Sequence, residues 1–190
     1  MGLFEPDRYY SSVASIDVEW DLARLHLSHA FLDVDNTLRR RDTGEVPLAV
    51  RSWLHQAHQK GIKLCLLSNN FHDDVYELAH ELDLPIVAKA MKPLPFGFKR
   101  ALRLLDATPE ESVMIGDQLF TDVVGAHVVG MQAYLVRPLV DADLKHTLFL
   151  RRIEERLLGN TDPASDVCVQ SSPSQVNQIE GDVPGERGRF

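Results

Sequence analysis

The stretch "AFLDVDNTLRR", residues 30–40, carries two aspartates, Asp33 and Asp35, one residue apart at the end of an apolar run. A short run that is apolar nearly throughout is typical of a strand buried on both faces of a sheet. Two carboxylates at this spacing repel each other and shift each other's pKa unless a cation or a shared proton relieves them. The stretch therefore predicts a buried strand that ends in a cation-binding acidic site.

Further short apolar runs follow this stretch, and segments with helical periodicity separate them. The runs are "IKLCLL" at 62–67, "LPIVA" at 84–88, "SVMIG" at 112–116 and "MQAYLV" at 131–136. The helical segments are "PLAVRSWLHQAHQKG" at 47–61, "FHDDVYELAHEL" at 71–82, "PFGFKRALRLL" at 95–105 and "LFTDVVGAHVVG" at 119–130. Alternating strands and helices predict a parallel sheet with right-handed crossovers, which is a Rossmann-like, doubly wound α/β fold.

The chain of 190 residues has the length of one domain with additions at both ends. We expect residues 1–29 to form a lead-in segment packed on the domain, with a short amphipathic helix within 17–26. The α/β domain is expected at 30–159 and ends in an amphipathic helix within 141–158. Residues 160–190 are rich in Ser, Pro, Gln, Gly and Asp, which predicts a disordered tail.

Composition excludes some classes of function. The formal net charge of −8 argues against a nucleic-acid partner, because nonspecific binding to nucleic acid needs a broad cationic surface. The two cysteines suggest no disulfide framework, which fits a reducing compartment. The chain also lacks a signal-like start and an apolar run long enough to span a membrane. We therefore expect a cytoplasmic protein.

The ends of the predicted strands bring polar residues together. In a doubly wound sheet, ligands bind beyond the carboxyl ends of the strands. Three strands end in polar residues at this edge, namely Asp33 with Asp35, Ser68 with Asn69, and Gly116 with Asp117.

A magnesium ion is the expected ligand of this acidic edge. Mg²⁺ prefers oxygen ligands and is commonly held by one or two carboxylates together with a substrate phosphate. Asp117 would join the first pair of aspartates, and Asp122 would add a further carboxylate. The predicted metal ligands are therefore Asp33, Asp35, Asp117 and Asp122.

Two other interpretations of the opening stretch are less favourable. Asp, Asn and Thr are common in turns, so "DNT" alone would suit a simple turn, and Asp122 alone could cap a helix. A calcium-binding loop would need glycine at its sixth position and glutamate at its twelfth. This sequence has Leu38 and Gly44 there, which argues against calcium.

Four motifs together resemble a known family. "DVDNT" at 33–37, "LLSNN" at 66–70, "KP" at 92–93 and "GDQLFTD" at 116–122 have the order and spacing of the motifs of the haloacid dehalogenase superfamily of phosphohydrolases. The resemblance covers about residues 20–140. With the run "KPLPFGFKRAL", the chain most resembles the YqeG branch of the capless subclass IIIA phosphatases, which is related to phosphatidylglycerophosphate phosphatases.

The resemblance implies a catalytic role for three residues. Asp33 would be the nucleophile that forms an aspartyl-phosphate. Asp35 would protonate the leaving oxygen and then deprotonate the hydrolytic water. Lys92 would neutralise charge on the transferring group and orient Asp33.

The same resemblance implies how phosphate and metal are bound. Ser68 and the backbone N–H of Asn69 would hold phosphate oxygens, and Thr37 would assist them. Asp117 and the backbone carbonyl of Asp35 would bind Mg²⁺.

The spacing of the motifs bears on the substrate. Residues 34–67 and 69–91 leave no room for a full cap domain, so the site should be open to a phosphate on a large carrier. The resemblance favours a lipid head group, phosphatidylglycerophosphate, which would lose its terminal phosphate. Peripheral contact with the inner face of a membrane is then expected, with Arg39, Arg40 and Arg41 toward the surface. A soluble metabolite or a phosphoprotein remains the alternative substrate.

Alternatives from another class are signalling and binding modules. Receiver domains share the acidic pair, Mg²⁺, a phosphorylated aspartate and a Lys-Pro. They resemble this chain less in order, because here Lys92 precedes the strand that bears Asp117. A phosphatase scaffold that only binds phosphate is a further alternative, although no catalytic position is replaced.

Overall fold

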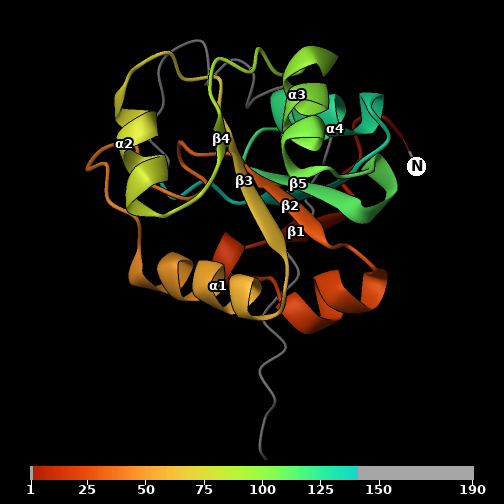
Figure 1. Ribbon diagram of the computed structural model, residues 1–190, viewed down its shortest axis with the longest axis horizontal. Coiled ribbons are helices and arrows are strands. Elements are labelled where there is room, and N and C mark those ends of the chain that lie inside the picture. Colours follow the sequence, from red (N-terminus) through yellow and green to blue (C-terminus); the bar gives the residue numbers. More distant parts are fainter. Residues whose placement is uncertain (1, 141–190) are drawn as a thin grey trace, which may run out of the picture.

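A parallel sheet forms the centre of the molecule. The computed structural model of the chain describes residues 2–140. In this part the sheet has six strands in the order β1-β6-β5-β2-β3-β4, and every neighbouring pair is parallel (Figure 1). The strands are β1 Arg8–Tyr10, β2 His29–Leu32, β3 Lys63–Leu67, β4 Ile86–Val87, β5 Ser112–Gly116 and β6 Gln132–Val136.

Helices cover both faces of the sheet. The α-helices are α1 Leu48–Gln59, α2 Asp74–Glu81, α3 Pro95–Leu105 and α4 Val124–Val128. Figure 1 shows α1 on one side of the sheet, with α3 and α4 on the other. Shorter 3-10 and π-helical turns lie at η1 Val13–Ser15, η2 Val18–Leu22, η3 Ala23–Leu25, η4 Pro109–Glu111 and η5 Leu119–Val123.

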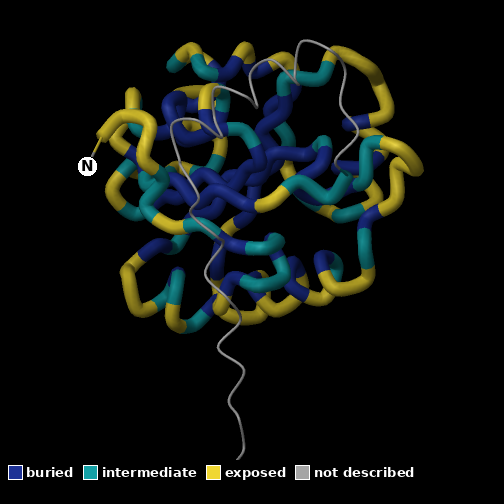
Figure 2. The backbone as a smooth tube through the Cα atoms, turned by 180° about the vertical axis from the view of Figure 1, so that it is seen from behind, coloured by how far each residue is buried: buried dark blue, intermediate teal, exposed yellow. Residues whose placement is uncertain are grey.

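Two hydrophobic clusters separate the layers. Alternate residues of a strand point to opposite faces, so Ala30 and Leu32 of β2 belong to the cluster beneath α1. Phe31 belongs to the cluster beneath α3 and α4. Burial on both faces explains why the strand sequences are apolar nearly throughout, and Figure 2 shows the buried segments running through the middle of the molecule.

The strand order places the topological switch point of the sheet between β2 and β5. The chain leaves β2 toward β3 on one side and leaves β5 toward β6 on the other. Ligands bind at such a switch point in doubly wound sheets. Because Leu32 pairs with Ile115, the residues that follow these two strands emerge next to each other at the carboxyl edge.

Most of the expected elements are present. The predicted α/β fold is confirmed, with each expected strand in place, although "LPIVA" contributes only two strand residues. Residues 119–130 begin as the π-helical turn η5 before α4. The expected helix within 141–158 and the tail at 160–190 lie outside the described residues.

The N-terminal segment differs from the expectation. Arg8–Tyr10 forms the edge strand β1, which pairs with β6, where only a packed lead-in was expected. The segment 17–26 is a π-helical turn followed by a 3-10 turn instead of a regular amphipathic helix. Asp17 starts it by accepting the N–H groups of Glu19 and Trp20 at 2.9 Å. The Trp20 side chain is exposed, with Arg24 over its ring.

Candidate active site

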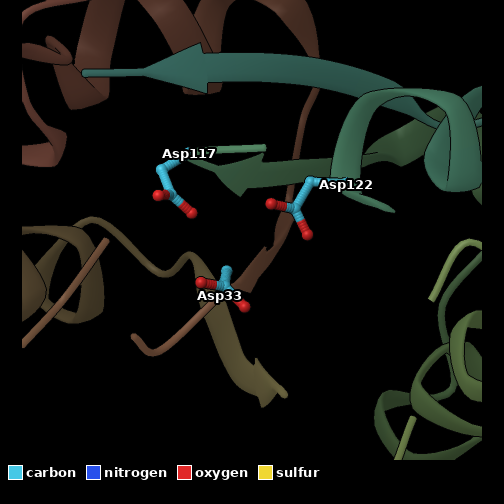
Figure 3. Close-up of side chains that lie close together, drawn as sticks. All are labelled: Asp33, Asp117 and Asp122. Atoms are coloured by element: carbon cyan, nitrogen blue, oxygen red, sulfur yellow. The ribbon is translucent and has the colours of Figure 1, made fainter. Parts of the chain in front are cut away.

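Three aspartates meet at the carboxyl edge of the sheet. Asp33 follows β2, and its N–H donates to the carbonyl of Ile115 at 2.9 Å, which holds it beside β5. Asp117 follows β5 directly, and Asp122 lies in η5. Figure 3 shows the three carboxylates around a common space, and ligand atoms from all three lie within 4.8 Å of one another.

Asp122 reaches this space because its turn is fixed at both ends. Its N–H donates to the carbonyl of Gln118 at 3.0 Å, and its Oδ2 accepts the N–H of Gln118 at 3.1 Å. Gly116 provides the room, since a Cβ at this position would overlap the carboxylate of Asp122. The glycine of "GDQLFTD" is therefore required by packing against the acidic cluster.

Lys92 supplies the cation within the cluster. Its Nζ lies 2.6 Å from Oδ1 of Asp33 and 2.7 Å from Oδ1 of Asp122, and its side chain is 1% exposed. Burial alone would lower the pKa of Lys92, but Asp122 and Asp33 raise it above its usual value. Lys92 therefore stays protonated beside the two carboxylates.

Asp33 has an unusual environment for a carboxylate. Burial raises the pKa of Asp33 to about 6, and the charges of Asp122 and Asp35 add to the rise, while Lys92 opposes it. The cost of ionising Asp33 thus depends on the cations around it. Lys92 provides one of them.

The cluster fits a divalent metal ion. Three buried carboxylates offer hard oxygen ligands, and with the single ammonium of Lys92 they leave an excess of negative charge. A divalent cation is the usual relief for such a set. The structure places Asp33, Asp117 and Asp122 to hold it.

The carboxylate of Asp35 points to other partners. Its Oδ1 accepts from Nε of Arg39 at 2.9 Å, and its Oδ2 accepts from Nδ2 of Asn70 at 3.1 Å. Asp35 was predicted among the metal ligands, and the described cluster of carboxylates does not include its side chain. Its backbone carbonyl remains the group that the resemblance assigns to the metal.

The loop after β3 positions Lys92. Oδ1 of Asn69 accepts the N–H of Lys92 at 2.7 Å, and Nδ2 of Asn69 donates to the carbonyl of Lys92 at 3.0 Å. Ser68 is buried, and its Oγ accepts the N–H of Asn70 at 3.0 Å. The Asn69 side chain thus holds the backbone of Lys92 in place, a role that was not expected from the sequence.

The predicted phosphate ligands differ in their access to the site. Ser68 and Asn69 line an open cleft of about 850 Å³ together with Asp33, Asp35 and Lys92. Thr37 is 1% exposed and does not line this cleft, so its placement gives it no surface toward a substrate phosphate. The other residues of the cleft wall are Arg39, Arg40, Arg41, Gly44, Asn70, Phe71, His72, Asp74, Gln118 and Thr121.

Sequence reasoning missed Asn70, which contacts Asp35, and it treated Arg39 only as one of a basic group. The signals were available in part. Asn70 belongs to the quoted motif "LLSNN", and Arg39 lies four residues after Asp35. Neither pattern shows that the turn after β2 folds back, so the contacts follow only from the structure.

Comparison with known proteins identifies the family of this protein. Residues 10–130 match the haloacid dehalogenase-like hydrolases. The chain belongs to this family. The resemblance found in the four motifs is therefore confirmed, and the assignment to subclass IIIA stays a prediction.

Relatives of this haloacid dehalogenase-like chain are phosphatases. It is 34% identical over 156 residues to the probable phosphatase YqeG of Bacillus subtilis, which covers 82% of this chain and 90% of that protein. It is also 34% identical over 94 residues to phosphoserine phosphatase of Thermus thermophilus, covering 45% of this chain and 38% of the relative. The chain is thus a YqeG-type phosphatase of the haloacid dehalogenase superfamily.

A solved structure shows the same fold. NagD from Escherichia coli K-12 superimposes with a TM-score of 0.50 at 14% identity, over 64% of this chain and 91% of that one. At this identity the similarity concerns the fold alone.

Proposed function

We propose that this phosphatase is a Mg²⁺-dependent phosphomonoester hydrolase that works through an aspartyl-phosphate on Asp33, with phosphatidylglycerophosphate as its substrate. The observation that carries the mechanism is the buried ammonium of Lys92 between Asp33 and Asp122, beside Asp117. This arrangement places a cation beside the proposed nucleophile in the wall of an open cleft, where it can face a phosphoryl group in transfer.

Asp33 is the nucleophile of the proposed reaction. Its carboxylate oxygen attacks phosphorus, and the bond from phosphorus to the leaving oxygen breaks. Asp35 gives a proton to that leaving oxygen, so the alcohol departs neutral. In the second step Asp35 takes a proton from water as the water oxygen bonds to phosphorus. The bond from phosphorus to the Asp33 oxygen breaks, so inorganic phosphate leaves and the carboxylate of Asp33 is restored.

Lys92 and Ser68 stabilise the group in transfer. Lys92 keeps Asp33 ionised and faces the phosphoryl oxygens with its ammonium. Ser68 lies in the cleft wall, where its hydroxyl can donate to a phosphate oxygen. The side chain of Asn69 fixes the backbone of Lys92, which helps the ammonium to hold its place as charge moves.

Asp33, Asp117 and Asp122, with the backbone carbonyl of Asp35, are the residues that would hold Mg²⁺. The bound ion would neutralise charge on the carboxylates and on the transferring phosphoryl group. The protein's contribution is to bring three carboxylates from β2, β5 and η5 to one buried place.

The open cleft supports a phosphate on a large carrier. Between Asp33 and Ser68 the chain forms a turn, a loop and α1, and between Ser68 and Lys92 it forms α2 and β4, which leaves the cleft uncapped by an inserted domain. Arg40 and Arg41 lie in the cleft wall, where basic side chains suit the phosphodiester of a phospholipid. Together with the YqeG resemblance, these features favour a lipid head group and peripheral contact at the inner face of a membrane.

A soluble metabolite or a phosphoprotein is the second candidate substrate. The net charge of −8 favours it, because a negative protein is repelled by anionic membranes unless basic patches face them. Among residues 2–140, no helix is both long and apolar enough to cross a bilayer. A signalling or binding module is the candidate from another class, and catalytic turnover would exclude it.

Phosphate release from a panel of phosphorylated lipids, sugars, nucleotides and peptides tests the proposal. We expect the highest kcat/KM on phosphatidylglycerophosphate in mixed micelles, with activity that is lost in EDTA and restored by Mg²⁺. Asp33→Asn should abolish it. Full activity of Asp33→Asn or activity without divalent metal would contradict the mechanism, whereas turnover of soluble substrates alone would contradict only the lipid assignment.

A further inference from the structure

Arg39 contacts the proposed acid–base residue through two donors. Its Nε and Nη2 lie 2.9 and 2.8 Å from the same oxygen of Asp35, Oδ1. The other oxygen, Oδ2, accepts from Nδ2 of Asn70 at the longer distance of 3.1 Å. Both oxygens of Asp35 are therefore held, one by the turn after β2 and the other by the loop after β3.

The backbone of this turn returns Arg39 to Asp35. The N–H groups of Leu38 and Arg39 both donate to the carbonyl of Val34, at 3.0 and 3.1 Å. The N–H of Asn36 donates to the carbonyl of Arg39 at 2.8 Å. These bonds fix the separation of the two side chains, so their contact does not depend on a flexible loop.

Arg39 is also anchored to α2. Its Nη2 lies 2.8 Å from Oδ2 of Asp74, the first residue of that helix, and Arg39 is 8% exposed. Burial alone would lower the pKa of Arg39, but Asp35 and Asp74 raise it above its usual value. The guanidinium thus remains a charged, planar fork with a fixed orientation.

We propose that Arg39 is a positioning residue that fixes Oδ1 of Asp35 and leaves Oδ2 as the oxygen that transfers the proton. This inference rests on the proposed function, in which Asp35 is the acid and base. Oδ2 releases its proton to the leaving oxygen as the phosphorus–oxygen bond breaks. It then receives a proton from water as the new phosphorus–oxygen bond forms. The hydrogen bond from Nδ2 of Asn70 to Oδ2 breaks to allow this transfer, while the contacts of Arg39 with Oδ1 remain.

The consequence depends on the leaving group. General acid–base catalysis contributes about 10²- to 10⁴-fold when the group is held in reach of its proton partner. An alkyl oxygen needs that proton to leave, whereas 4-nitrophenolate is a stable anion and leaves without it. Loss of Arg39 should therefore slow alkyl phosphates far more than 4-nitrophenyl phosphate. A purely structural role would slow both alike.

The experiment measures kcat and KM of the Mg²⁺-loaded full chain on 4-nitrophenyl phosphate and on its best alkyl phosphate. For Arg39→Ala we expect a loss of about 10²-fold in kcat on the alkyl phosphate, less than about tenfold on the aryl phosphate, and unchanged KM. Arg39→Lys keeps the charge without the fork and should recover part of the loss. Asp74→Asn removes only the anchor of Arg39 on α2. It should also slow the alkyl phosphate more than the aryl phosphate, but by a smaller factor.

Arg51→Ala is the matched control. Arg51 also pairs with α2, through Glu81 at 2.6 Å, but it does not line the cleft, so both substrates should be unaffected. Equal losses on both substrates in Arg39→Ala, or an increase in KM, would overturn the inference.

Asp35→Asn separates this inference from the proposed mechanism. If it retains full activity on the alkyl phosphate, the proposed mechanism fails, and if it loses activity while Arg39→Ala does not, only the inference fails.

Discussion

The ammonium of Lys92 lies 2.6 Å from Oδ1 of Asp33, with side chains that are 1% and 11% exposed. The two residues are far apart in sequence, and Asn69 fixes the backbone of one of them by two hydrogen bonds. Because a nucleophilic carboxylate must be ionised, a buried cation at this distance favours the reactive form. Changes at either residue are therefore expected to alter both the stability and the chemistry of the protein.

Lys92→Ala should weaken the fold and the reaction together. The substitution leaves Asp33 and Asp122 buried without their shared cation, and breaking a buried pair costs about 3–5 kcal/mol in the free energy of unfolding. Loss of one electrostatic stabiliser of the transition state should lower kcat by about 10²- to 10³-fold. Urea unfolding in EDTA and steady-state kinetics measure the two effects.

Lys60→Ala serves as the control for Lys92→Ala. Lys60 pairs with Glu19 at 2.9 Å on the exposed surface, so its loss should leave the unfolding midpoint and kcat unchanged. If Lys92→Ala behaves like this control, the buried pair has no role in either property.

The pKa of Asp33 predicts a pH dependence of stability in metal-free protein. This pKa is raised from 3.8 to about 6 on folding, so the folded state binds more protons than the unfolded state between these values. The contribution of Asp33 to stability is thus present below pH about 4 and is lost as pH rises through about 6. Asp33→Asn lacks this loss.

Urea unfolding of both proteins in EDTA from pH 3.5 to 7.5 checks the prediction. The free energy of unfolding of Asp33→Asn relative to wild type should rise from pH about 4 to 6 and then stay level. A difference that is constant with pH would show that folding does not change the pKa of Asp33.

Gly116→Ala should disturb the metal site without replacing any of its ligands. The added Cβ would overlap the carboxylate of Asp122, which must move away from Asp33 and Asp117. We expect Mg²⁺ to bind at least about tenfold more weakly, which corresponds to about 1.4 kcal/mol. Calorimetric titration of Mg²⁺ measures this, and circular dichroism confirms the fold. Unchanged affinity would mean that Asp122 does not contribute to the site.

Much of the fold could be predicted because burial on both faces makes parallel strands apolar throughout. Runs such as "SVMIG" at 112–116 matched β5 for this reason. The edge strand β1 escaped prediction, since its three residues, Arg8–Tyr10, include a charged one and pair on a single side. The segment 17–26 was misjudged because apolar spacing does not show that a π-helical turn capped by Asp17 gives way to a 3-10 turn.

The parts of the site that were predictable are the residues that directly follow a strand of the sheet. Asp33 and Asp117 come together because β2 and β5 are neighbours, which the doubly wound pattern implies. Contacts that depend on turn geometry were not predictable, as Arg39 with Asp35 shows. Thr37 belongs to the same turn, and its burial away from the cleft wall likewise follows only from the structure.

The most direct test of the account is the identity of the phosphorylated residue. Enzyme quenched with acid during turnover of a ³²P-labelled substrate should carry a hydroxylamine-labile label, and mass spectrometry should place it on Asp33. The label should be absent from Asp33→Asn. Label on another residue, or turnover at full rate with no covalent label at any quench time, would contradict the claim that Asp33 is the nucleophile.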